Sequence, residues 1–304
     1  MTTALSPSAV AAIDDLELAA RLVVEGLRSG PHRSPFHGFT AEFSQHRPYR
    51  PGDDLKYLDW KILGRTDRLY SKQFRESTSM SVMLVLDTSG SMDFPSASAD
   101  GPSKFTYASI VAASLAYLVV TQGDAAGLMT MGGEKWQYLP ARGGRPHLRL
   151  LLAHIDRATP AGAWTLDRTI GRAADLLKRR GVIVVISDFY EAGDDTFRAL
   201  RQVARRGHDV ALLQVLSRPE ITFPFAADVE LEDLESGARR TVDTGAVGRS
   251  YRSAVADFLA RCRTSALQDG ADYALMPTDV PPEQALRTYL LKRGAAAAAP
   301  RVPR

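Results

Sequence analysis

The stretch that decides the fold runs from residue 81 to residue 92 and reads SVMLVLDTSGSM. Its first six residues are almost all apolar, which is typical of a strand buried on both faces of a parallel sheet. The run ends in Asp87, and Ser89 and Ser91 follow at alternate positions around Gly90. Alternate side chains of an extended chain share one side, so we expect the carboxylate and the two hydroxyls to converge at the end of this strand.

The composition is that of a soluble globular protein. The chain has 304 residues, of which 45% are hydrophobic, enough for one large core or two smaller ones. No apolar run reaches the roughly 20 residues that span a bilayer, and the longest, 110–120, is expected to be a core helix. The first 15 residues do not resemble a signal peptide, and the single Cys262 excludes an intrachain disulfide and a cysteine-based metal cage. These features predict a cytoplasmic protein.

From residue 81 onward, apolar strands alternate with helices. Strands are predicted at 81–87, 125–131, 135–139, 181–187, 209–216 and 271–276, with a polar hairpin near 228–243. Helices are predicted at 104–121, 145–157, 166–180, 194–206, 247–268 and 283–292. Fully apolar strands separated by helices predict an α/β fold, with a mostly parallel sheet that is covered by helices on both faces.

The chain before residue 79 has a different character. An amphipathic helix is predicted at 14–28 and a strand at 69–74, and between them the turn RPYRPGDD at 47–54 leads into a further helix. We therefore divide the chain into three predicted parts. They are an N-terminal segment at 1–78, an α/β domain at 79–294 and a flexible tail at 295–304.

The polar residues at the strand ends favour a divalent metal ion. Asp87 and Asp188 each close an apolar strand, and ligands bind beyond the carboxyl ends of parallel strands. Carboxylates and hydroxyls are hard oxygen ligands, which favour Mg²⁺ or Mn²⁺ over Zn²⁺. A threonine of the 158–165 loop can add a third hydroxyl. The alternative is that Ser89 and Ser91 only cap a turn or the start of a helix.

The stretch DTSGS at 87–91 resembles the Asp-x-Ser-x-Ser motif of the metal-ion-dependent adhesion site in von Willebrand factor type A domains. The order of the predicted elements is also similar to that fold: site strand, long helix, edge hairpin, threonine loop and a strand ending in aspartate. The resemblance implies a site that binds Mg²⁺ (or Mn²⁺) through five residues. They are Asp87, Ser89, Ser91, Thr165 and Asp188.

A second resemblance covers most of residues 14–292. The stretches HRPYRPGDDLKYLDWK at 46–61 and KQF at 72–74 resemble the bacterial family called domain of unknown function 58. Members of that family carry a Gly-Gly-Thr-x-Leu run before the threonine-loop helix, whereas residues 162–166 read GAWTL. Thr159 or a water molecule is therefore an alternative to Thr165 as a ligand.

The ligand set favours binding over catalysis. Neutral hydroxyls and two carboxylates neutralise a divalent cation incompletely and leave a coordination position open. A glutamate or aspartate of another protein can fill that position, as in the adhesion sites that the motif resembles. Proteins of this resemblance often sit beside MoxR-type AAA+ ATPases, which implies an adaptor for such an ATPase in protein remodelling or complex assembly. We predict no enzymatic activity and no membrane span.

Two other functions stay open. A Mg²⁺-dependent hydrolase acting on a phosphoester can be assembled from scattered residues. The chain, however, contains no Asp-x-Asp pair, no phosphate-binding Gly-x-x-x-x-Gly-Lys-Ser/Thr motif and no zinc-binding His-Glu-x-x-His motif. A nucleic-acid binder is suggested by residues 28–75, which carry ten Lys/Arg against five Asp/Glu together with several aromatic side chains.

Overall fold

The computed structural model describes most of the chain. The described residues are 5–28, 43–48, 62, 64–65, 69–74, 80–95, 101–132, 135–163, 166–177, 179–225, 229–232 and 239–298. They fall into two compact units, which we describe separately. The larger unit holds the described residues up to 28 and from 81 onward, and the smaller unit holds those from 43 to 80.

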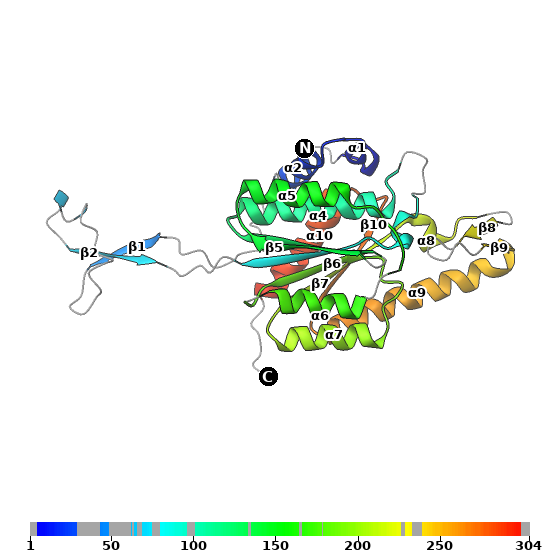
Figure 1. The fold of residues 1–304 in the computed structure, drawn as a ribbon. Coiled ribbons are helices and arrows are strands. Elements are labelled where there is room, and N and C mark those ends of the chain that lie inside the picture. Colours follow the sequence, from blue (N-terminus) through cyan, green and yellow to red (C-terminus); the bar gives the residue numbers. More distant parts are fainter. Residues whose placement is uncertain are drawn as a thin grey trace. The chain divides into compact units, whose positions relative to one another are not determined.

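The larger unit is built on a six-stranded sheet with the strand order β10–β7–β6–β3–β4–β5 (Figure 1). Neighbouring strands are parallel, except that β5 pairs antiparallel with β4. The mostly parallel sheet predicted from the sequence is therefore confirmed. Its strands are β3 (Ser81–Asp87), β4 (Ala125–Gly132), β5 (Lys135–Arg142), β6 (Val182–Ser187), β7 (Asp209–Leu216) and β10 (Asp272–Pro277).

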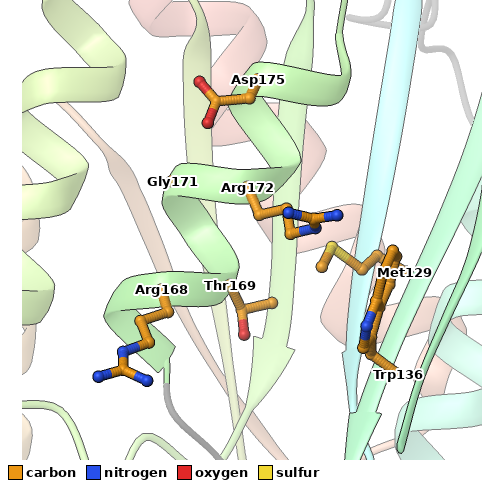
Figure 2. Close-up of a pocket in the computed structure, with 7 residues that line it drawn as sticks. All are labelled: Met129, Trp136, Arg168, Thr169, Gly171, Arg172 and Asp175. Carbon is orange, nitrogen blue, oxygen red and sulfur yellow. The ribbon is translucent and has the colours of Figure 1, made fainter.

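Helices cover both faces of this sheet, as predicted (Figure 1). On one face α4 packs against α2, α5 and α10, whereas α6, α7 and α9 lie on the other face and share a hydrophobic core with β3, β6 and β7. At the edge of the second face, Trp136 of β5 remains 43% exposed beside α6 (Figure 2). The helices are α2 (Leu16–Arg28), α4 (Lys104–Thr121), α5 (Arg145–Arg157), α6 (Leu166–Leu176), α7 (Asp194–Arg205), α9 (Thr244–Gln268) and α10 (Pro282–Ala298).

Helix α4 lies at the centre of the unit. It is apolar on nearly all sides because it is enclosed between the sheet and the outer helices. Ser103 caps its start by accepting a hydrogen bond from the Thr106 amide at 3.1 Å. Among the described residues, α4 is the one helix long and apolar enough to cross a membrane, but 78% of it is buried inside the unit. The prediction of a core helix at 110–120 is confirmed.

Several short or terminal elements differ from the predictions. Three elements of four or five residues were not predicted, because such short pieces show no hydrophobic period. Helix α10 continues to Ala298, into the predicted flexible tail at 295–304, since alanine has the highest helix propensity. Residues 299–304 lie outside the described residues. The additional elements are α1 (Pro7–Ala11), the 3₁₀-helix η2 (Gly90–Asp93) and α8 (Arg218–Thr222).

The parts around the main sheet agree with the predictions only in part. The predicted polar hairpin is present as β8 (Val229–Glu232) and β9 (Arg239–Val242). In the smaller unit β1 (Phe43–Pro48) pairs antiparallel with β2 (Tyr70–Phe74), at the strand predicted for 69–74. The predicted N-terminal segment is divided, because α2 packs on α4 and so belongs to the larger unit. Most of the PGDD turn, its following helix and the basic stretch lie outside the described residues.

Candidate metal centre

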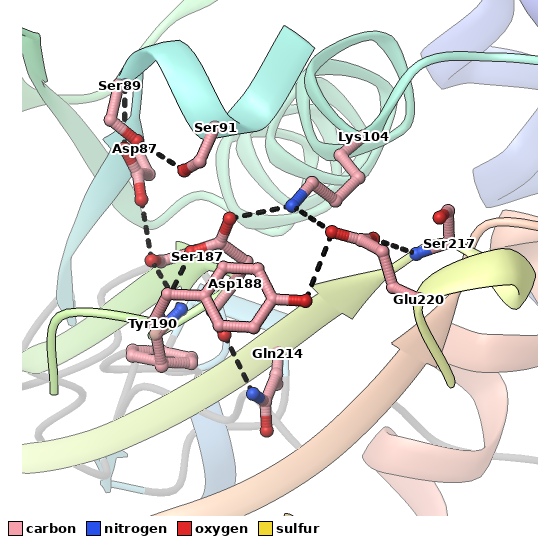
Figure 3. A network of polar contacts seen from close by, with 11 residues as sticks. Asp87, Ser89, Ser91, Lys104, Ser187, Asp188, Tyr190, Gln214, Ser217 and Glu220 are labelled. Atoms are coloured by element: carbon pink, nitrogen blue, oxygen red, sulfur yellow. Dashed lines mark hydrogen bonds and ion pairs between the residues drawn. The ribbon is translucent and has the colours of Figure 1, made fainter. Parts of the chain in front are cut away.

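Two buried carboxylates meet where the neighbouring strands β3 and β6 end. The register pairs Leu86 with Ile186, so Asp87 lies beside Ser187, and Asp188 follows at the same edge. The Ser187 hydroxyl donates a hydrogen bond to Asp87 Oδ2 at 2.6 Å (Figure 3). Asp87 is 2% exposed and Asp188 is 3% exposed. The pairing of two apolar strands therefore brings together the two acids that the sequence predicted as ligands.

The turn after β3 places the two serines next to Asp87. The Ser89 amide donates a hydrogen bond to Asp87 Oδ1 at 2.8 Å, and η2 begins at Gly90. The Ser89 hydroxyl makes no capping bond to the backbone of η2. It lies instead 3.1 Å from the Ser91 hydroxyl oxygen. The side chain of Ser89 therefore faces the Ser91 hydroxyl and does not cap the short helix.

The loop at 158–163 is attached to this turn through its backbone. The Ala161 amide donates a hydrogen bond to the Thr88 carbonyl at 2.8 Å, and the Gly90 amide donates one to the Gly162 carbonyl at 2.7 Å. The predicted ligand Thr165 lies outside the described residues. The alternative, Thr159, is exposed and does not line the small cavity between Asp87 and Asp188.

One small cavity connects the remaining predicted ligands. Its volume is about 10 Å³, which is close to the space that a single water molecule or ion occupies. In the part of the chain that the structure describes, no three His, Cys, Asp or Glu side chains form a metal-binding group, so a metal here needs the serine hydroxyls as ligands. The cavity is lined by Asp87, Ser89, Ser91, Leu166, Ser187, Asp188, Phe189 and Glu191.

A fully buried lysine, which the sequence reasoning missed, holds Asp188. Lys104 Nζ lies 2.7 Å from Asp188 Oδ2 and 2.7 Å from Glu220 Oε1 (Figure 3). Burial by itself would lower the pKa of Lys104, but the two carboxylates raise it above its usual value, so the ammonium stays charged. The sequence did contain a signal, because Lys104 is the first residue of α4. A cation is unfavourable at a helix N-terminus and indicates nearby acids.

Glu220 links this lysine to the elements that follow β7. Glu220 Oε2 accepts a hydrogen bond from the Ser217 amide at 2.7 Å, and Oε1 accepts one from the Tyr190 hydroxyl at 3.1 Å. The Gln214 side chain donates to the Asp188 carbonyl at 2.7 Å. Burial raises the pKa of Tyr190, so its hydroxyl remains a donor. Asp188 is therefore held directly by α4 and β7, and α8 contributes through the contact of Glu220 with Lys104.

The negative charges of this network outnumber its positive charges when all of its groups are ionised. Asp87, Asp188 and Glu220 carry three negative charges when ionised, and Lys104 supplies one positive charge, which leaves a net charge of −2. Burial, and next the repulsion from Asp188, raise the pKa of Asp87 to about 7. A divalent cation in the cavity would neutralise this charge.

The donor atoms also fit Mg²⁺ in chemistry and spacing. Neighbouring ligands of an octahedral Mg²⁺ lie about 3 Å apart when each is about 2.1 Å from the ion. The hydroxyl oxygens of Ser89 and Ser91 are 3.1 Å apart. A carboxylate oxygen has two lone pairs, so the hydrogen bonds from Ser89 and Ser187 leave Asp87 able to bind a metal. The residues present therefore fit a hard divalent cation.

Comparison with known proteins identifies relatives over most of the chain. The profile of the family described as protein of unknown function DUF58 matches residues 45–263. An uncharacterized protein of Mycobacterium tuberculosis strain H37Rv is 32% identical over 238 residues, which cover 77% of this chain and 73% of that protein. The uncharacterized protein YeaD of Bacillus subtilis is 32% identical over 140 residues, 44% of this chain and 32% of that protein.

Solved structures resemble the larger unit at low sequence identity. An aerotolerance-related membrane protein from Bacteroides fragilis aligns with a TM-score of 0.50 and 16% identity, over 72% of this chain and 100% of that chain. A von Willebrand factor type A structure from Catenulispora acidiphila aligns with a TM-score of 0.40 and 13% identity, over 72% of this chain and 43% of that chain.

The predicted fold class and family are both supported. The parallel sheet with its antiparallel edge strand, covered by helices on both faces, is a von Willebrand A-like α/β domain. The profile covers well over half of the residues of this chain, and the Mycobacterium relative aligns with this chain over 73% of its own length. The chain belongs to the family described as protein of unknown function DUF58.

Proposed function

We propose that the chain is a Mg²⁺-dependent protein-interaction module that binds an acidic residue of a partner protein. The von Willebrand A-like fold supports an interaction module in general. One observation carries the metal-dependent mechanism: the four predicted ligand side chains that the structure describes, from two strand ends, line a single cavity inside a network whose net charge is −2 when its acids are ionised. They belong to Asp87, Ser89, Ser91 and Asp188.

The four residues differ in what they would do for the metal. Asp87 and Asp188 would supply negative charge, Ser89 and Ser91 neutral oxygens, and Thr165 is the further ligand that the family resemblance implies. Lys104 holds one carboxylate oxygen of Asp188 and so fixes the orientation of that side chain. Bound Mg²⁺ (or Mn²⁺) would keep part of its positive charge and one open coordination position, to which a partner carboxylate can bind.

The partner that the family resemblance favours is a MoxR-type AAA+ ATPase. In this proposal the chain acts in the cytoplasm as an adaptor that connects the ATPase to a client, in protein remodelling or complex assembly. The adaptor needs only a reversible, metal-gated contact. That contact requires no nucleophile and no general base. The proposed mechanism therefore gives the residues around the cavity no catalytic role.

Metal binding is tested first, without a partner. Titration calorimetry with MgCl₂ and MnCl₂ is expected to show one site on the wild-type protein and none on Asp87→Ala. Asp93→Ala is the matched control, because Asp93 is an exposed acid of the same turn that does not line the cavity. Absence of binding of either ion to the wild-type protein, with its fold intact, contradicts the metal centre.

Partner capture is tested second. A MoxR-type ATPase from the same organism is passed over immobilised wild-type protein in Mg²⁺ and then in EDTA. We expect capture in Mg²⁺, loss in EDTA, and no capture by Asp87→Ala or Ser89→Ala, whereas Asp93→Ala behaves as wild type. Capture that persists in EDTA rules out the metal-gated mechanism. No capture despite intact Mg²⁺ binding rules out this partner and leaves the metal site in place.

A further inference from the structure

A groove separate from the metal cavity lies between helix α6 and the edge strand β5 (Figure 2). Its volume is about 570 Å³, within the range of sites that bind small molecules or peptide side chains. The sheet side is formed by Met129 and Trp136. The helix side is formed by residues of α6, namely Arg168, Thr169, Gly171, Arg172 and Asp175.

The sequence of two elements explains why this groove is open. The β4–β5 pairing sets Trp136 opposite Met131 and Tyr138 opposite Met129, so both aromatic rings lie on the α6 face of the sheet. Trp136 is nevertheless 43% exposed. On the facing helix Gly171 has no side chain, and a Cβ placed there would meet no atom within 4 Å. The helix side of the groove is therefore open at Gly171.

The groove also carries positive charge. The Arg172 guanidinium lies 4.6 Å from the centre of the Trp136 ring, a cation–π contact that holds the two groups together. Arg168 stands one turn earlier on α6. Neither arginine forms an ion pair with an acid among the residues that the structure describes. Asp175 lines the groove but is already paired with Arg206 at 2.5 Å.

We propose that this groove binds an acidic peptide segment of a partner protein. An apolar side chain of the segment lies between Trp136 and Gly171, and a neighbouring carboxylate binds Arg172. The guanidinium matches a carboxylate with two parallel hydrogen bonds. Because Arg172 is already held over the indole, it loses little side-chain freedom when the carboxylate arrives. The groove needs no metal, so the proposal does not depend on the metal centre.

A nucleic acid fits this groove less well. Nucleic-acid binding depends on many phosphate contacts along an extended basic surface. Here one helix supplies two arginines, and the rest of the lining is apolar or already paired. A short segment that combines one or two acids with an apolar side chain matches both the charge and the shape.

The probe is a set of fluorescein-labelled heptapeptides in which glutamates flank a leucine, phenylalanine or methionine. The same peptides with glutamine in place of glutamate are the charge control. Binding is followed by fluorescence anisotropy in EDTA, and the indole N–H signal of Trp136 is followed by NMR. We expect at least one acidic peptide to bind and to shift that signal. We expect its glutamine counterpart to bind roughly tenfold more weakly.

Variants on the two sides of the groove test the assignment. Arg172→Ala is expected to weaken binding roughly tenfold, and Gly171→Phe to abolish it by filling the groove. Gly171→Ala places only a methyl group in open space and is expected to keep binding. Arg149→Ala removes an exposed arginine from α5 on the opposite face of the sheet and is expected to have no effect.

Each outcome decides for or against the proposal. Peptide binding that is unchanged in both Arg172→Ala and Gly171→Phe overturns it, as does the failure of every acidic peptide to bind. If a labelled single-stranded oligonucleotide binds with the same dependence on Arg172 and the peptides do not, the site belongs to nucleic acid instead. Asp87→Ala is expected to bind the peptides normally, which separates this result from that of the metal tests.

Discussion

Replacing Asp87 with asparagine keeps the size of the side chain and removes its charge. In the wild-type protein, burial and the repulsion from Asp188 raise the pKa of Asp87 to about 7, from the usual value of 3.8. The amide oxygen of the variant can still accept the hydrogen bond from the Ser89 amide, and its NH₂ group can donate to Ser187. The substitution therefore changes mainly the electrostatic energy of the site.

The sign of the effect follows from the direction of the pKa change. A group whose pKa is higher in the folded state takes up a proton on folding between about pH 4 and pH 7. Its contribution to stability is complete below about pH 4 and is lost as the pH rises through 7. A pKa difference of about 3 corresponds to about 4 kcal/mol. Asp87→Asn takes up no such proton on folding. Its free energy of unfolding, relative to that of wild type, is therefore expected to rise by about 1.4 kcal/mol per pH unit up to about pH 7.

Urea unfolding at about pH 5, 6, 7 and 8 in EDTA measures this difference in the free energy of unfolding. Asp93→Asn is the matched control, because it removes an exposed acid from the same turn. Excess Mg²⁺ at about pH 8 is expected to raise the free energy of unfolding of the wild-type protein and to leave that of Asp87→Asn unchanged. If the difference between wild type and Asp87→Asn does not change with pH, the buried-charge reasoning is wrong.

Three further substitutions around the site, and a fourth in α6 for contrast, are tested by urea unfolding. Lys104→Met leaves two buried carboxylates without their cation and is expected to cost about 3–5 kcal/mol; a cost below about 1 kcal/mol would contradict the buried ion pair. Tyr190→Phe removes one hydrogen bond to a carboxylate and is expected to cost about 1–2 kcal/mol. Gly132→Ala drives a methyl group into the Thr88 carbonyl and is expected to cost about 1–3 kcal/mol, whereas Gly171→Ala, in open space, is expected to gain about 0.5–1 kcal/mol.

Much of the fold could be predicted because its signals are local. The strand at 81–87 and the helix at 104–121 have the bounds predicted for them. A polar break follows each apolar run, and Ser103 marks the start of the helix with a capping side chain. The predicted strands at 125–131 and 135–139 are separated by only three residues in the sequence, and they pair as β4 and β5. These features depend on neighbouring residues, which a single sequence displays directly.

Other features depend on residues far apart in the chain. The helix predicted at 14–28 was assigned to the N-terminal segment, because nothing in its own sequence shows that α2 packs on α4. The ion pairs of Lys104 join it to residues 84 and 116 positions away. Asp87 and Asp188 were predicted as a pair because each closes an apolar strand and because the adhesion-site motif that 87–91 resembles implies both. Glu220, in a five-residue helix, gave no comparable signal.

The buried lysine compensates part of the negative charge of this site in the absence of a metal. Three buried carboxylates with no cation would oppose folding strongly, whereas Lys104 compensates one charge permanently and fixes two of the three acids. Asp87 carries part of the negative charge that Lys104 does not compensate. Its pKa of about 7 lets it take up a proton when no metal is bound. In the proposed metal centre, metal and proton would therefore compete for this carboxylate, and the affinity for Mg²⁺ is expected to fall as the pH drops below about 7. A metal affinity that does not change across this range would show that Asp87 is not a ligand.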